Sequence, residues 1–152
     1  MNVCVDDRYV LDTSAILTLV DDEEGSDEVE RLLRGSRTGR LQAFACSITL
    51  MELFYTALRE KGEDEAVMLS ALVKAYPLEW LYPDEKTLLQ AARLKATHAL
   101  SVADALIAAT AKLRGAVLAH KDPEFEALRK EVVLLSLPFK RRTKRGRAAA
   151  GQ

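Results

Sequence analysis

Short apolar runs alternate with longer amphipathic segments along most of the chain. The runs are rich in β-prone residues and predict strands at residues 8–11, 41–46, 78–81, 116–119 and 132–135. The segments between them carry capping residues and apolar positions at helical spacing, which predict helices. This alternation predicts an α/β fold with a short, mostly parallel central sheet that helices cover on both faces.

Capping and breaking residues mark the ends of these helices. The first predicted helix follows Asp12, and later ones begin at Ser26, at Ser47 or Thr49, near residue 64 and after Pro83. The glycines and polar residues of segment 35–40 predict a loop. Near the C-terminus, Asp122 followed by proline predicts a short further helix.

The segment 101–111 predicts a helix that is buried on most of its surface. Ser101 is a good N-cap, Asp104 stands three residues later, and no further charge follows until Lys112. A carboxylate at the start of a core helix is costly unless something compensates it. The cap itself and the helix dipole are one such compensation, and a bound cation is the other.

Three further acids occupy comparable places. Asp12 and Asp122 each follow a predicted strand, at the sheet edge where α/β proteins collect their functional groups, while Glu52 lies among large apolar residues early in its helix. Each acid alone has a structural explanation. If the fold gathers them, two carboxylates about 4 Å apart repel by roughly 4 kcal/mol, whereas a helix N-terminus offsets only about 0.3–1 kcal/mol.

A divalent cation would balance such a group. All the available ligands are hard oxygens with no cluster of Cys or His, which favours Mg²⁺, with Mn²⁺ as a substitute, over zinc. Such an ion can activate water for attack on a phosphodiester. The candidate metal ligands are therefore Asp12, Glu52, Asp104 and Asp122, and Ser14 is a hydroxyl that either caps the helix or orients Asp12. The number of ions stays open.

Other chemistries fit less well. Ser14 lacks the Gly-x-Ser-x-Gly turn that would suit a hydrolase triad with His98 or His120. The chain has no phosphate-binding glycine loop, so an NTPase is not favoured. A phosphoaspartyl phosphatase requires a second acid where Ser14 stands. His120 has two open interpretations, a substrate contact or an ordinary histidine at a strand end.

Composition bounds the class of protein. The 152 residues, 49% apolar and 30% charged, indicate a globular protein with a single domain at residues 1–139. We expect a cytoplasmic location, because no apolar run reaches the length of a membrane span and the N-terminus does not resemble a signal peptide. Cys4 and Cys46 have no metal-binding spacing, and we interpret them as reduced thiols.

The net charge of −1 conceals an asymmetry. Six basic residues and no acid lie in the C-terminal tail, residues 140–152, which leaves 16 basic and 23 acidic residues in residues 1–139, a net charge of −7. Such a tail can bind a polyanion in a salt-dependent way. The alternative is a disordered, solvated terminus without a partner.

Four motifs, in order, resemble those of the PIN domain family. They are residues 9–15 (YVLDTSA), 47–53 (SITLMEL), 101–111 (SVADALIAATA) and 117–125 (VLAHKDPEF). The resemblance runs from about Tyr9 to Leu137, and the length looks most like a VapC-type toxin of a toxin–antitoxin pair. His120 departs from the sequence that many members have before the last acid, and the basic tail lies outside the family core.

The resemblance implies a three-layer α/β/α fold and a Mg²⁺-dependent endoribonuclease that cleaves single-stranded regions of RNA. It also implies a homodimer that a small antitoxin holds inactive. Carried over by position, Asp12, Glu52, Asp104 and Asp122 form the acidic site, with Thr13 or Ser14 as the neighbouring hydroxyl. The alternative is a non-catalytic PIN-like module that binds RNA or a partner.

Apolar residues on two of the predicted helices offer a surface for such partners. Core packing is the default role of these side chains, with a dimer interface or an antitoxin groove as the alternative for some: Leu53, Phe54, Leu69, Leu72 and Val73.

Overall fold

A computed structural model describes residues 7–139; Cys4 and the basic tail lie outside the described residues. Five strands form a single sheet in the order β3-β2-β1-β4-β5, and all four pairings are parallel. The strands are β1 (Arg8–Leu11), β2 (Gln42–Cys46), β3 (Glu79–Leu81), β4 (Val117–His120) and β5 (Leu134–Ser136). The α/β class, the parallel sheet and the five predicted strands are confirmed.

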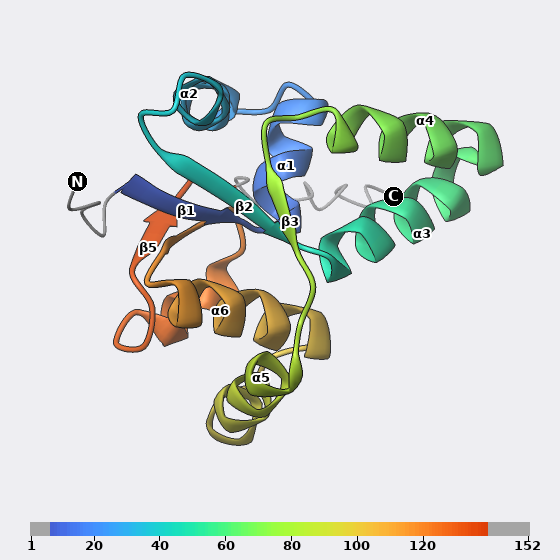
Figure 1. The fold of residues 1–152 in the computed structure, drawn as a ribbon. Coiled ribbons are helices and arrows are strands. Elements are labelled where there is room, and N and C mark those ends of the chain that lie inside the picture. The colour runs from blue at the N-terminus through green and yellow to red at the C-terminus, as the bar shows by residue number, and fades with distance from the viewer. Residues whose placement is uncertain (1–6, 140–152) are drawn as a thin grey trace, which may run out of the picture.

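Helices cover both faces of this sheet (Figure 1). In Figure 1, α5 and α6 lie below the sheet, α1 and α2 lie above it, and α3 and α4 form a hairpin to the right. The helices are α1 (Thr13–Val20), α2 (Ser26–Arg37), α3 (Ile48–Lys61), α4 (Glu63–Lys74), α5 (Glu85–Thr97), α6 (Val102–Arg114) and the 3₁₀ helix η2 (Pro123–Leu128).

Two hydrophobic cores lie on the two sides of the sheet. Successive strand residues point to opposite faces, so Val10 joins the core under α5 and α6 whereas Leu11 joins the core under α1 and α2. Leu118 and Ala119 of β4 divide between the two cores in the same way. Burial on both faces explains why these strands are apolar throughout rather than alternating.

Helix α6 is buried over much of its length, as its sequence predicts. Its residues 105–111 are all buried, and the Oγ of Ser101 caps it by accepting from the backbone N–H of Asp104 over 3.1 Å. Gly115 ends it in the left-handed region, with φ of 57°, where glycine has no steric cost.

One local prediction was wrong, and another was confirmed only in position. Segment 35–40 is not all loop, because α2 continues to Arg37; Gly35 lies within it where an added Cβ would come within 2.7 Å of the side chain of Leu41. That glycine serves close packing rather than a turn. Of the two predicted starts of α3, Ser47 stands at the N-cap, although its side chain makes no capping hydrogen bond, and Thr49 lies against Thr13 of α1.

The strand order places a topological switch point between β1 and β4. The chain leaves β1 toward β2 and β3 on one side, and it returns to β4 and β5 on the other. In open parallel sheets, ligands bind at the carboxyl ends of the strands beside such a point. No helix within residues 7–139 is long and apolar enough to cross a bilayer.

Candidate metal centre

Asp12 lies at the switch point, directly after β1. Its backbone N–H donates to Ala119 O over 2.9 Å, which continues the β1–β4 pairing, and its Oδ2 caps α1 by accepting from the Ser14 N–H over 3.1 Å. The residue is only 3% exposed. Within the described part of the chain, its second oxygen, Oδ1, is buried without a hydrogen-bond partner. One oxygen of this carboxylate is therefore fixed by hydrogen bonds, and the other has no hydrogen-bond partner among the described residues.

Ser14 fixes the orientation of Asp12. Its hydroxyl donates to Oδ2 of Asp12 and accepts from the backbone N–H of Lys121 over 2.9 Å. It therefore joins the end of β1 to the segment after β4. Both of its hydrogen-bonding roles are used without a histidine, so the described residues give no support to a serine–histidine triad.

Asp104, Asp122 and Glu124 converge beside this point. Each offers a carboxylate oxygen, and these oxygens lie within 4.8 Å of one another. Asp104 comes from the first turn of α6, while Asp122 caps η2 by accepting from the N–H of Glu124 over 3.0 Å. Two separate helix starts therefore direct acids to one place.

Glu52 approaches from α3. Its Oε1 accepts from Oγ1 of Thr13 over 2.7 Å, and the same hydroxyl lies 3.0 Å from Oγ1 of Thr49. Thr13 thus holds Glu52 as Ser14 holds Asp12, one on each side of the turn that follows β1. We use the name acidic cluster for Asp12, Glu52, Asp104, Asp122 and Glu124.

The acids of this cluster influence one another. Burial raises the pKa of Asp12 from 3.8 to about 7; hydrogen bonds from Ser14 oppose this, and the charges of Asp104 and Glu52 add to it. Burial likewise raises the pKa of Asp104 to about 6, opposed by Ser101 and assisted by the charges of Asp122, Glu52 and Glu124. Charge on these groups is therefore costly in the protein alone.

The acidic cluster fits a divalent metal ion. Its donors are all carboxylate oxygens, the ligands that Mg²⁺ and Mn²⁺ prefer. The unpartnered Oδ1 of Asp12 is a buried acceptor that a cation would satisfy, and a positive charge would offset the burial and the repulsion that raise the pKa of Asp12. Asp104, Asp122 and Glu124 are close enough together to share one ion.

His120 belongs to the fold. It is fully buried, and burial lowers the pKa of its imidazole. Its Nδ1 accepts from the backbone N–H of Asp122 over 3.2 Å, and its Nε2 lies 3.1 Å from Oγ of Ser136 on the edge strand. Of the two open interpretations, the structure supports the histidine that shapes the turn carrying Asp122.

Two residues of this region were missed from the sequence. The sequence around Glu124 gives one indication of its role, because an acid two residues after the capping Asp122 lies at the same helix start. An acid at that position is equally well explained by its favourable interaction with the helix dipole. Lys121 has none. Its ammonium binds Glu23 Oε2 over 3.0 Å and the backbone oxygen of Glu24 over 2.9 Å, which ties the α1–α2 loop to the edge of the site.

The raised pKa of Asp12 predicts a pH-dependent effect of Asp12→Asn. A carboxyl whose pKa is higher in the folded state than the unfolded value favours folding while protonated, so this contribution is lost as pH rises from about 4 to about 7. In EDTA, the free energy of unfolding of Asp12→Asn is compared with that of the wild-type protein. The gain from the substitution should be up to about 4 kcal/mol larger at pH 8 than at pH 4. Urea denaturation at the two pH values measures this. Equal effects at both would contradict a buried, titrating Asp12.

Comparison with known proteins agrees with this geometry. The sequence profile of the PIN domain matches residues 9–131. A search of curated proteins finds no match. Among solved structures, the fold is similar to VapBC2 from Rickettsia felis bound to a DNA fragment from its promoter, with 18% identity and a TM-score of 0.70 over 86% of this chain and 99% of that one.

Two further structures share the fold. DNA-bound VapBC from Salmonella typhimurium is 24% identical, with a TM-score of 0.69 over 85% of this chain and 97% of that one. VapC20 from Mycobacterium tuberculosis, a toxin that cleaves the sarcin–ricin loop, is 19% identical, with a TM-score of 0.62 over 78% and 93%. The profile match spans every residue of the acidic cluster, and the chain belongs to the PIN domain family.

Proposed function

We propose that this protein is a metal-dependent endoribonuclease that cleaves single-stranded regions of RNA and serves as the toxin of a toxin–antitoxin pair. The gathering of carboxylates at the switch point, among them the buried Asp12 and the half-buried Asp104 with their raised pKa values, carries the proposal. The similar fold of VapC20, a toxin that cleaves an RNA loop, supports RNA as the substrate. We further propose that it acts in the cytoplasm as one PIN-like domain, residues 1–139, followed by the basic tail.

In this proposal, Asp12, Glu52, Asp104 and Asp122 hold Mg²⁺, for which Mn²⁺ can substitute, and Glu124 adds a further carboxylate. The ion would supply Lewis acidity toward the phosphodiester and its attacking water. Ser14 keeps Asp12 turned toward the site, and Thr13 does the same for Glu52. Because each acid is held by a hydrogen bond or stands at a helix start, the ligands are arranged before the metal binds.

Removing one carboxylate tests this activity. Asp104→Asn keeps the size of the side chain but removes its charge, so we expect Mg²⁺-dependent cleavage of an RNA mixture to fall by at least about 100-fold. Asp64→Asn, an exposed acid on α4, is the matched control and should cleave as the wild type does. Gel analysis with Mg²⁺ and with EDTA measures both.

An Asp104→Asn variant that remains folded and as active as the wild type would refute this site. If the wild-type protein binds Mg²⁺ and RNA without cleaving any RNA tested, a non-catalytic binding module explains the chain better.

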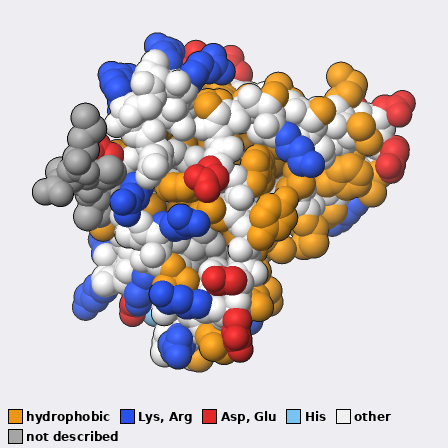
Figure 2. Space-filling view, viewed as in Figure 1, with side chains coloured by type: hydrophobic (Ala, Val, Ile, Leu, Met, Phe, Trp, Pro, Cys, Tyr) orange, Lys and Arg blue, Asp and Glu red, His pale blue; other side chains and the backbone are white. Residues whose placement is uncertain are grey.

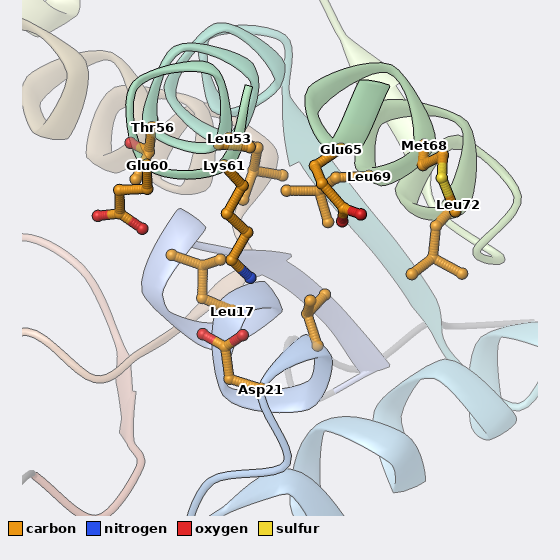
Figure 3. Close-up of a pocket in the computed structure, with 12 residues that line it drawn as sticks. Leu17, Asp21, Leu53, Thr56, Glu60, Lys61, Glu65, Met68, Leu69 and Leu72 are labelled. Atoms are coloured by element: carbon orange, nitrogen blue, oxygen red, sulfur yellow. The ribbon is translucent and has the colours of Figure 1, made fainter. Parts of the chain in front are cut away.

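An apolar groove away from the acidic cluster supports an antitoxin partner. It has a volume of about 340 Å³ and lies between α1, α3 and α4. Hydrophobic side chains gather over the α3–α4 hairpin in Figure 2. In Figure 3, Leu69 and Met68 of α4 border the groove while Lys61 of α3 extends toward Leu17 and Asp21 at its floor.

The chemistry of this groove indicates what would occupy it. Leu53 and Val73, from the predicted apolar set, are fully buried in the core, whereas Leu72 is 46% exposed at the groove. Three acids and one lysine line its edges, namely Asp21, Glu60, Glu65 and Lys61. An antitoxin segment with an apolar stripe and flanking basic residues would complement this surface.

A charge placed in the groove should disrupt this complex. We expect Met68→Lys to weaken antitoxin binding at least tenfold, because the partner's apolar residues would have to bury an unpaired charge. Val67→Lys is the matched control, since Val67 is also more than half exposed on the same helix but does not line the groove. Binding is measured by calorimetry with the antitoxin that copurifies from the native host. Equal affinities for the two variants would rule out the groove.

We also propose that the protein is a homodimer. A second apolar surface, on α5 and the start of α6, exposes about half or more of the side chains of Leu88, Leu89 and Val102. Leu88 and Val102 line a hollow of about 230 Å³, and its other lining residues are apolar apart from Lys95. Exposed apolar surface of this kind is typical of subunit interfaces.

Light scattering tests the dimer. We expect a mass twice that of one chain at micromolar concentration, and Leu88→Glu should shift it toward the mass of one chain, because a buried carboxylate opposes association. A wild-type mass of one chain at every concentration would refute the homodimer.

A further inference from the structure

His120 connects the sheet to the turn that carries two acids of the acidic cluster. It ends β4, its side chain is fully buried, and the rings of Phe125 and Phe139 lie 5.3 and 6.1 Å from its own ring. Its Nδ1 accepts from the backbone N–H of Asp122 over 3.2 Å, so this nitrogen carries no proton. The single ring proton is therefore on Nε2, on the other side of the imidazole.

The edge strand β5 supplies the partner of this second nitrogen. His120 and Ser136 are paired residues in the parallel register of β4 and β5, which places their side chains on the same face of the sheet. The Oγ of Ser136 lies 3.1 Å from Nε2 of His120. Since Nε2 carries the proton, the hydroxyl accepts this hydrogen bond and keeps its own proton to donate elsewhere.

Glu126 accepts the proton of that hydroxyl. Its Oε1 receives the hydrogen bond from Ser136 and lies 3.5 Å from Nε2 of His120, while its Oε2 forms an ion pair with Arg129. The hydrogen bond from Ser136, assisted by Arg129, holds the pKa of Glu126 below its usual range, so this group is a carboxylate that only accepts. We use the name histidine network for His120, Ser136 and Glu126.

The histidine network holds η2 at two points. Asp122 caps the start of this helix and is bonded to the ring, whereas Glu126 lies within the helix and is bonded to the hydroxyl. Oδ1 of Asp122 also accepts from the N–H of Glu124 over 3.0 Å. Since the carboxylates of these two acids converge with that of Asp104, a displaced ring would move two of the three converging groups together.

We propose that Ser136 and Glu126 are positioning residues of the metal centre, which act through the His120 ring to hold the Asp122 turn where its carboxylates bind a divalent ion. The inference rests on the proposed function, because it concerns the same acidic cluster. Groups that orient metal ligands from outside are worth about 10–100-fold in metal affinity. Ser136 acts through one intervening side chain, so the effect of removing its hydroxyl lies at or below the lower end of that range.

A purely structural role is the competing explanation. The same hydrogen bonds join the edge strand β5 to η2, so their loss would lower the stability of the protein even if the acids stayed in place. The two explanations differ in metal affinity. A positioning network changes the affinity of the folded protein for a divalent ion, whereas a structural one changes only the free energy of unfolding.

The test variant is Ser136→Ala, which removes the hydroxyl without changing any charge near the metal centre. Ser136→Thr keeps the hydroxyl at an exposed strand position, where a β-branched residue is favoured, and is the rescue variant. Ser36→Ala is the matched control. It also removes a hydroxyl that joins two elements, since Ser36 donates to Pro77 O over 2.8 Å, but these residues precede β2 and β3 and lie at the opposite edge of the sheet.

Three measurements are made on the full-length chain. Electron paramagnetic resonance of free Mn²⁺ gives the metal affinity without RNA, and urea denaturation in EDTA gives the free energy of unfolding. ¹H–¹⁵N NMR of the imidazole nitrogens gives the tautomer of His120 in the wild-type protein. The sequence contains one other histidine, His98, and His98→Gln assigns the two sets of signals.

We expect Ser136→Ala to bind Mn²⁺ at least about fivefold more weakly than the wild type, with Ser136→Thr and Ser36→Ala within about twofold of it. In cleavage, the Mg²⁺ concentration that gives half the maximal rate should rise by a similar factor for Ser136→Ala, while kcat at saturating Mg²⁺ stays within about twofold. The NMR spectrum should show His120 with its proton on Nε2.

Wild-type Mn²⁺ affinity of Ser136→Ala would overturn the inference and leave the structural role, and so would a loss of affinity that Ser136→Thr does not restore. A proton on Nδ1 of His120 would contradict the direction of the histidine network.

The metal measurement separates this inference from the nuclease activity. If Ser136→Ala loses Mn²⁺ affinity but the wild-type protein cleaves no RNA, the inference stands and the nuclease fails. If the wild type cleaves RNA and Ser136→Ala binds Mn²⁺ equally well, the nuclease stands and the inference fails. A wild-type protein that binds no Mn²⁺ would refute the metal centre and the inference with it.

Discussion

Burial of carboxylates at one edge of the sheet is the constraint on which the rest of this structure depends. Asp12 is almost wholly enclosed, one of its oxygens has no hydrogen-bond partner, and its pKa rises to about 7. Such a group destabilises the protein near neutral pH. A bound cation would offset this cost, because the negative charge of Asp12 that opposes folding would also attract the ion.

The parallel sheet brings these acids together from distant parts of the sequence. Asp12 follows β1, Glu52 comes from α3, Asp104 from the start of α6, and Asp122 and Glu124 from the start of η2. Each element is anchored independently in one of the two cores or by a local hydrogen bond. The positions of these acids are therefore set by elements that pack in the two cores, and Lys121 additionally ties the α1–α2 loop to the edge of the site.

The surfaces around the acidic cluster divide its proposed interactions. The apolar groove between α1, α3 and α4 lies on one side of the switch point, and a second pocket, beside Ser14, lies at the cluster itself. Leu17 and Asp21 line both, so they form one continuous path along α1. In the proposed function, a partner seated in the groove would therefore lie beside this pocket at α1 and could interfere with binding there.

The sequence by itself determined the strands, most helix ends, the burial of α6 and the capping positions of Asp12 and Asp122. These follow from local spacing and from hydrogen bonds between residues at most four apart. The four motifs also pointed to the PIN domain family, which the profile match confirms. Only the tertiary structure decided that α2 runs through Gly35, that His120 is enclosed and that Glu124 joins the acidic cluster. It alone links Lys121 to Glu23, because contacts between residues about 100 positions apart depend on how the sheet is assembled, and no local pattern records them.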